Sequence, residues 1–66
     1  MGELLIDVYE KVKNNRHVII SIVKINNQYV IENCIVEHGN ISLVSREKFG
    51  KLEKAKEKFE KLKATA

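Results

Sequence analysis

The chain has 66 residues and a formal net charge of +3, with 44% hydrophobic residues, 32% charged residues, one cysteine and no proline. A chain of this length forms one small domain that buries only about 60% of its unfolded surface, so its stability is marginal without a staple or a partner. The single cysteine excludes an intramolecular disulfide, and the composition is typical of a folded domain and not of a disordered tail.

The longest apolar stretch runs from Val18 to Ile25 and is interrupted by Ser21 and Lys24. It is far shorter than the roughly 20 residues that a membrane-spanning helix needs. The first residues carry acidic side chains where a secretory signal would carry basic ones. We therefore expect a cytoplasmic protein with no membrane contact. In that reducing compartment Cys34 would act as a small hydrophobic residue.

Residues 3–13 fit two structures. As a strand they place one set of apolar residues on a single face, and as a helix they form an equally good stripe from a different set. The strand set is Leu4, Ile6, Val8 and Val12, and the helix set is Leu5, Val8, Tyr9 and Val12. The β-branched residues favour the strand. A helix here would give the alternative order α-β-β-β-α.

The middle of the chain is typical of β-structure. Residues 17–25 and 28–37 are rich in β-branched residues, and 41–44 form a short third segment of the same kind. Asparagine tolerates left-handed backbone conformations, so Asn14-Asn15 and Asn26-Asn27 predict tight hairpin turns. Gly39-Asn40 predicts the last turn. The pattern indicates an antiparallel meander of three to four strands.

Residues 46–64 predict one long amphipathic helix. Apolar residues recur every three or four positions, and the other positions are almost all lysine or glutamate. Ser45 is the expected N-cap, because its hydroxyl can accept a hydrogen bond from a free amide of the first turn. The apolar seam consists of Phe49, Leu52, Ala55, Phe59 and Leu62. The expected fold is therefore α+β, a β-meander followed by a C-terminal helix, in a single domain spanning residues 1–66.

The basic charge is concentrated at the C-terminal end. Residues 1–44 hold four basic and five acidic residues, whereas residues 45–66 hold eight basic and four acidic ones. Such an excess can attract nucleic acid or an acidic protein surface. The simpler interpretation is a solvated helix face with ion pairs three or four residues apart. These pairs would be Glu47–Lys51, Glu53–Lys56, Glu57–Lys61 and Glu60–Lys63.

The sequence offers little for catalysis. It lacks a nucleophile elbow, a glycine-rich phosphate loop and a paired-histidine motif. A Cys34–His38 pair and a metal site from His17, Cys34 and His38 are both disfavoured, because nothing in the spacing brings these residues together. We expect no enzyme activity, no cofactor and no bound metal.

Binding of single-stranded nucleic acid is the favoured hypothesis. Basic residues lie around the first predicted hairpin, and tyrosines lie on neighbouring strands, an arrangement in which cations neutralise phosphates and rings stack on bases. An equally weighted interpretation makes both tyrosines half-buried strand residues. The candidate phosphate contacts are Lys11, Lys13, Arg16 and Lys24, and the candidate stacking residues are Tyr9 and Tyr29.

Three segments of the chain resemble the positive-cofactor-four family of transcriptional coactivators. They are the strand from Arg16 to Lys24, the run Tyr29-Val30-Ile31, and Gly39-Asn40-Ile41-Ser42-Leu43 leading through Glu47 and Phe49 to Leu52. The resemblance implies a homodimer that binds single-stranded DNA in channels formed by curved sheets. It also implies that the two helices pair, so that the seam becomes the dimer interface and the four cations contact DNA.

Two other families are similar in part. The order α-β-β-β-α matches a double-stranded-RNA-binding domain, with Arg46, Lys48 and Lys51 near its last helix. A helix followed by strands with Asn26-Asn27 at the hairpin is similar to Sm-like RNA proteins. A function of a different class also stays open, namely a protein-interaction module that docks through the C-terminal helix, because a heptad-like seam suits a partner helix.

Overall fold

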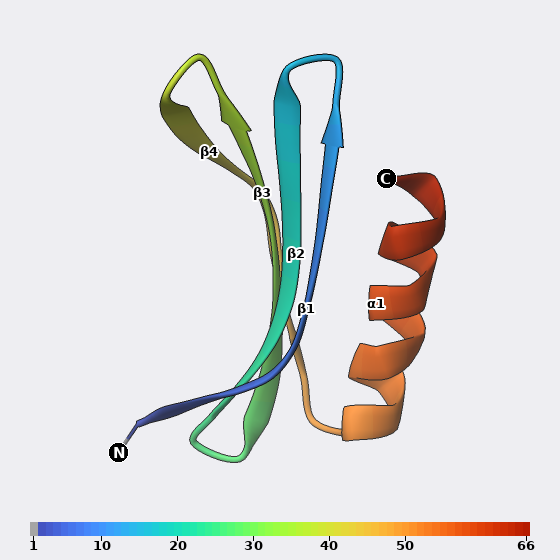
Figure 1. Ribbon diagram of the computed structural model, residues 1–66. Coiled ribbons are helices and arrows are strands. Elements are labelled where there is room, and N and C mark those ends of the chain that lie inside the picture. Colours follow the sequence, from blue (N-terminus) through green and yellow to red (C-terminus); the bar gives the residue numbers. More distant parts are fainter. Residues whose placement is uncertain (1) are drawn as a thin grey trace.

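The computed structural model describes residues 2–66 and consists of one sheet and one helix (Figure 1). The strands are β1 (Glu3–Lys13), β2 (Arg16–Ile25), β3 (Gln28–Glu37) and β4 (Asn40–Phe49), and the helix is α1 (Leu52–Thr65). The strands lie in the order β1-β2-β3-β4, and each pairs antiparallel with the next. The expected meander followed by a C-terminal helix is confirmed. Residues 3–13 form a strand, so the alternative order α-β-β-β-α is wrong.

Three two-residue turns connect the strands, and each has two consecutive residues at positive φ. The pairs are Asn14-Asn15, Asn26-Asn27 and His38-Gly39. Positive φ at both central residues is the geometry whose twist matches that of the flanking strands, and asparagine and glycine adopt it at the lowest cost. The first two turns fall where the sequence predicted them. The third lies one residue before the expected Gly39-Asn40 pair, and Asn40 begins β4.

The strand register divides the side chains between two faces of the sheet. Tyr9, Ile20 and Asn33 lie side by side on β1, β2 and β3, and side chains two residues away along each strand share their face. This is the face that α1 covers (Figure 1), and we call it the covered face. The buried cluster beneath the helix consists of Ile20, Ile22, Ile31, Ala55 and Phe59. We call the opposite side of the sheet the open face.

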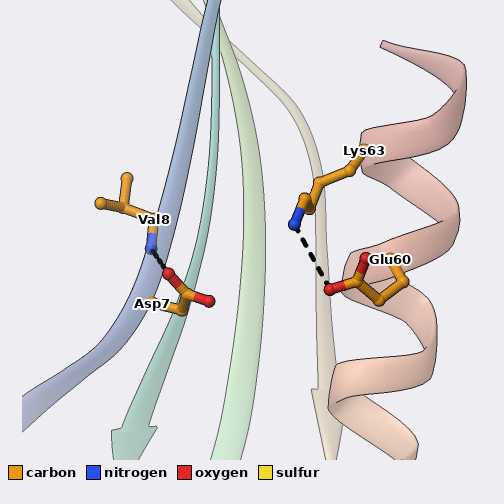
Figure 2. A network of polar contacts seen from close by, with 4 residues as sticks. All are labelled: Asp7, Val8, Glu60 and Lys63. Carbon is orange, nitrogen blue, oxygen red and sulfur yellow. Dashed lines mark hydrogen bonds and ion pairs between the residues drawn. The ribbon is translucent and has the colours of Figure 1, made fainter.

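The register shifts once on each edge strand. On β1 the shift lies between Leu5 and Asp7, where the Asp7 Oδ1 accepts a hydrogen bond of 2.8 Å from the Val8 amide (Figure 2). On β4 the shift lies opposite Asn33 and Cys34. Such bulges bend and twist an edge strand, which discourages further strands from pairing with it.

The strand–helix boundary differs from the prediction. β4 extends to Phe49 instead of ending at residue 44, and α1 begins at Leu52 instead of residue 46. Pairing with the whole length of β3 holds residues 45–49 in the sheet, and the Arg46 Nε lies 3.3 Å from the Glu32 Oε2 across the two strands. Ser45 is therefore a strand residue and no cap. The N-cap is Lys51, which makes no side-chain capping bond.

This boundary also changes the ion pairs. Glu47 lies on β4, so its partner is not Lys51 but Lys58 of the helix, at 3.7 Å. The predicted pair of Glu60 and Lys63 is present at 3.4 Å (Figure 2).

The apolar seam of the helix packs against the chain's own sheet. Ala55 and Phe59 are fully buried in the cluster, and Leu62 packs on it while partly buried. Phe49 joins the same cluster from the end of β4. Four of the five residues expected to form a dimer or partner interface thus contribute to the core of a single chain, whereas Leu52 is half-buried outside that cluster. No helix within residues 2–66 is long and apolar enough to cross a membrane.

Candidate functional site

A pocket of about 440 Å³ opens at the end of the sheet where the β1–β2 hairpin approaches the C-terminal end of α1. Figure 1 shows this approach, with the last turn of the helix beside β1. The pocket is lined by apolar residues, which we call its floor, and by polar residues, which we call its rim. The apolar residues are Val18, Ile35, Leu62 and Ala66, and the polar residues are Lys11, Lys13, Asn14, Arg16, Asn33 and Thr65.

Three cations meet at the rim of this pocket. Lys13 and Arg16 face each other as the closing pair of the hairpin, and Lys11 lies two residues before Lys13 on the same face. Like charges directly opposite each other on a sheet are destabilising. Within residues 2–66 the carboxylate paired with these cations is that of Glu37, whose Oε2 lies 3.7 Å from the Arg16 guanidinium with both side chains about half-exposed. The rim therefore keeps an excess of positive charge, and a bound anion would reduce the repulsion between these cations.

Lys11 connects the hairpin to the helix. Its ammonium donates a hydrogen bond of 2.9 Å to the main-chain oxygen of Ala66. A cation at the end of a helix is favourable, because the last carbonyls carry partial negative charge. This bond closes one side of the pocket and holds the end of α1 beside β1.

Asn33 places an amide in the pocket. On the covered face of β3 it lies between Ile31 and Ile35, in an otherwise apolar row. Its Oδ1 is buried and has no hydrogen-bond partner among residues 2–66. A buried acceptor without a partner costs roughly 1–3 kcal/mol, so such atoms in native proteins usually have a role. Asn33 therefore contributes a buried acceptor without a partner to the residues that line the pocket.

The remaining predicted contacts lie elsewhere on the covered face. Lys24 is at the other end of β2, eight residues and roughly 26 Å from Arg16. Its Nζ lies 5.9 Å from the centre of the Tyr29 ring, and Tyr29 packs on the core. The structure thus brings Lys11, Lys13 and Arg16 together and leaves Lys24 and Tyr29 apart from them.

Tyr9 is near the pocket but covered by the helix. It packs against the core, and the Lys63 Nζ lies 5.6 Å from the centre of its ring. The same ammonium lies 5.3 Å from the Phe59 ring centre, so one lysine covers both aromatics. Figure 2 shows Lys63 reaching from the helix toward the sheet. Both tyrosines have the half-buried position that was weighed against a stacking role.

Asn33, Asn14 and Thr65 were not among the predicted contacts. The signal for Asn33 was available in the sequence, because a poor strand former interrupts the alternating apolar row of β3. Asn14 and Thr65 gave no such signal, since the first looked like a turn residue and the second like a helix end. Their place in the pocket depends on how the helix packs.

The open face has a different character. Its exposed apolar side chains include Leu5, Val8, Val12, Ile41 and Leu43, which come from the two edge strands. The charged residues there are mostly paired within the chain. Glu10 lies 3.2 Å from the His17 Nε2, and Glu32 pairs with Arg46.

The residues considered for metal or thiol chemistry are spread over the molecule. Cys34 is half-buried on β3, His38 lies in the β3–β4 turn, and His17 pairs with Glu10. Within residues 2–66 no group of three or more potential ligands is close enough to hold a metal ion.

Comparison with known proteins gives no relative. The chain matches no family model, no curated protein and no solved structure.

Proposed function

We propose that this protein binds single-stranded nucleic acid, with a backbone phosphate on the cations of the hairpin pocket. The convergence of Lys11, Lys13 and Arg16 on one pocket carries this proposal. Cations that approach a phosphate from two strands and a hairpin can contact several of its oxygens, and neutralised phosphates release condensed counterions.

Asn33 favours a nucleotide over a bare anion. An inorganic anion offers acceptors, which suit the cations but not the buried Asn33 oxygen. A nucleotide supplies both, because its phosphate accepts and its base amino groups or ribose hydroxyl donate. The pocket floor of Val18, Ile35 and Leu62 gives the base or sugar an apolar surface.

A nucleic-acid partner also agrees with the cytoplasmic location expected from the sequence. The resemblance to the positive-cofactor-four family makes DNA the preferred polymer. The proposed contacts differ from those expected earlier, since Asn33 replaces the two tyrosines and Lys24 lies outside the pocket.

Fluorescence anisotropy with a labelled single-stranded DNA of about 20 nucleotides tests the proposal. We expect binding that weakens steeply with salt, and competition by duplex DNA weaker than by the single strand. Replacing the three pocket cations together (Lys11→Ala, Lys13→Ala, Arg16→Ala) should abolish most of the affinity. It should also reduce the salt slope by about two to three.

A matched control removes the same charge elsewhere. Lys51, Lys54 and Lys56 are exposed at the start of the helix, at the opposite end from the pocket. Replacing these three with alanine should lower affinity much less. Equal losses in the two triple variants would show non-specific attraction and contradict the pocket assignment. No binding by the unmodified protein at low salt would exclude nucleic acid.

A protein-interaction role is the second candidate, and one observation favours it. The helix seam expected to dock a partner is buried within the chain, but the open face of the sheet exposes a row of apolar side chains. This surface has the character of an interaction site.

A further inference from the structure

The chain exposes more surface than a compact protein of its mass. Its accessible surface is 4864 Å². A folded monomer of 7.6 kDa is expected to expose about 4,300 Å². The excess is roughly 560 Å². The helix covers one face of the sheet only, in a molecule measuring 35 × 26 × 15 Å.

The uncovered surface is apolar near both edges. On β1 the exposed fraction is 45% for Val8 and 70% for Val12, and on β4 it is 75% for Ile41 and 57% for Leu43. The strands between them contribute Ile19, Val23, Cys34 and Val36 to the same face. One level of polar side chains (Ser21, Glu32 and Arg46) crosses this face between its apolar residues. Exposed apolar surface of this kind on a small protein is a candidate interaction site.

The charged residues of the two edge strands differ in sign on this face, and between them His17 of β2 lies against Glu10 and Glu32 of β3 pairs with Arg46. By register, Glu3 and Glu10 lie on the open face of β1, and Arg46 and Lys48 lie on the open face of β4. Two copies of such a surface are complementary in charge when they pack so that β1 of one copy meets β4 of the other. They repel each other when β1 meets β1.

We infer that the open face binds a second copy of this chain, face to face, about a two-fold axis parallel to the strands. In this arrangement β1 of each copy lies against β4 of the other, and β2 lies against β3. The two sheets form a sandwich with a helix on each outer side, and both hairpin pockets stay accessible. The inference does not depend on the proposed nucleic-acid binding, because the pocket lies on the covered face.

The strand register specifies which residues meet. Val8 lies level with Ser21, Glu32 and Arg46 across the sheet, so it faces Arg46 of the second copy. Glu10 is level with Ile19, Cys34 and Leu43, so it faces Leu43 of the second copy. This level is next to the level that contains Arg46. Four strands of ten residues cover roughly 500–600 Å². With the side chains at the rim, this approaches the roughly 800 Å² per partner of a standard stable interface.

Sedimentation velocity over a range of protein concentrations tests the inference. The unmodified protein should sediment as a dimer. Val8→Lys places a cation opposite Arg46 of the second copy, and Leu43→Asp places an acid opposite Glu10. Each should raise the dimer dissociation constant about tenfold or more. The control is Leu4→Asp, since Leu4 is 62% exposed but lies on the other face. This variant should remain dimeric.

Two further measurements depend on the orientation and not on folding. Val8→Asp should weaken the dimer less than Val8→Lys, because an acid at this position meets Arg46 of the second copy. Mixing the separately monomeric Val8→Lys and Leu43→Asp proteins should restore dimers, because the mixed dimer places the new lysine and the new aspartate at neighbouring levels of one edge, while the other edge keeps its native residues.

The inference is overturned if the unmodified protein stays monomeric at high concentration. It is also overturned if Leu4→Asp dissociates the dimer as strongly as Leu43→Asp does. Failure of mixing to restore dimers would overturn the orientation. Circular dichroism of each variant shows whether its chain is folded, so loss of fold is distinguished from loss of dimer.

Discussion

The two faces of the sheet contain similar apolar residues that differ in exposure, although Val30 of the open face is also buried, at 2%. On the covered face, Ile20, Ile22 and Ile31 are buried beneath Phe59 of the helix. On the open face, side chains of the same chemical kind, such as Ile41 and Leu43, are more than half exposed. One helix of 14 residues can cover only one side of a four-stranded sheet. A run of β-branched residues therefore predicts a strand, but it does not predict burial. Burial depends on whether another element packs on that face.

The comparison also explains where the charges gather. The cations of the hairpin are on the covered face beyond the end of the helix, so the helix leaves a pocket beside them. On the open face, Glu10 lies against His17, and Glu32 forms an ion pair with Arg46 on the neighbouring strand. Unbalanced charge suits a charged ligand, whereas paired charge on an apolar surface suits a protein.

The largest expected effect is that of a truncation in the core between the covered face and the helix. Phe59 is 2% exposed at the centre of the core, and Phe59→Ala should cost about 3–5 kcal/mol, enough to unfold a chain of this size. Leu43→Ala on the open face is the matched truncation and should cost about 1 kcal/mol or less at protein concentrations where the chain is monomeric. Urea denaturation measures both. Equal losses would mean that the two faces are equally buried.

The next effect separates stability from function in the pocket. Asn33→Leu removes a buried acceptor that has no partner within residues 2–66. The variant should gain about 1 kcal/mol of stability while losing affinity for single-stranded DNA. Thermal denaturation and anisotropy measure the two changes. A variant that loses stability would show that Asn33 contributes to the fold, and unchanged affinity would remove it from the site.

The third turn offers a smaller gain. His38 has a φ of 53°. Within the part of the chain that the structure describes, every other residue with a positive φ is an asparagine or a glycine. His38→Asn would create the Asn-Gly pair favoured in such turns and should stabilise the protein by about 0.5 kcal/mol. Asn14→Ala is the converse change at another left-handed position and should destabilise it. Opposite signs in thermal unfolding would support the turn geometry on which both faces depend.

The smallest effect concerns the outer surface of the helix. Glu60 and Lys63 form an exposed pair at 3.4 Å, and Glu60→Gln should change stability by less than about 0.5 kcal/mol. The change should shrink further at high salt. A larger loss in urea denaturation would mean that Glu60 holds Lys63 over Tyr9 and Phe59, and so stabilises the covered face.

Local signals in the sequence determined most of the fold. Paired asparagines placed the first two turns, β-branched alternation placed the first three strands, and the period of Leu52, Ala55 and Phe59 placed the helix. Each of these depends on residues close together in the chain. The boundary at residues 45–51 was wrong, because pairing with β3 overrides a helical pattern that looks continuous from Phe49 onward.

Only the tertiary structure decided which surfaces are free. The sequence placed Lys11, Lys13 and Arg16 near one another, but it could not show that Lys63 covers Tyr9. Nor could it show that Asn33 lines the same pocket as Thr65. The reason is physical: alternation along a strand separates two faces, but the packing of the helix decides which of them is covered.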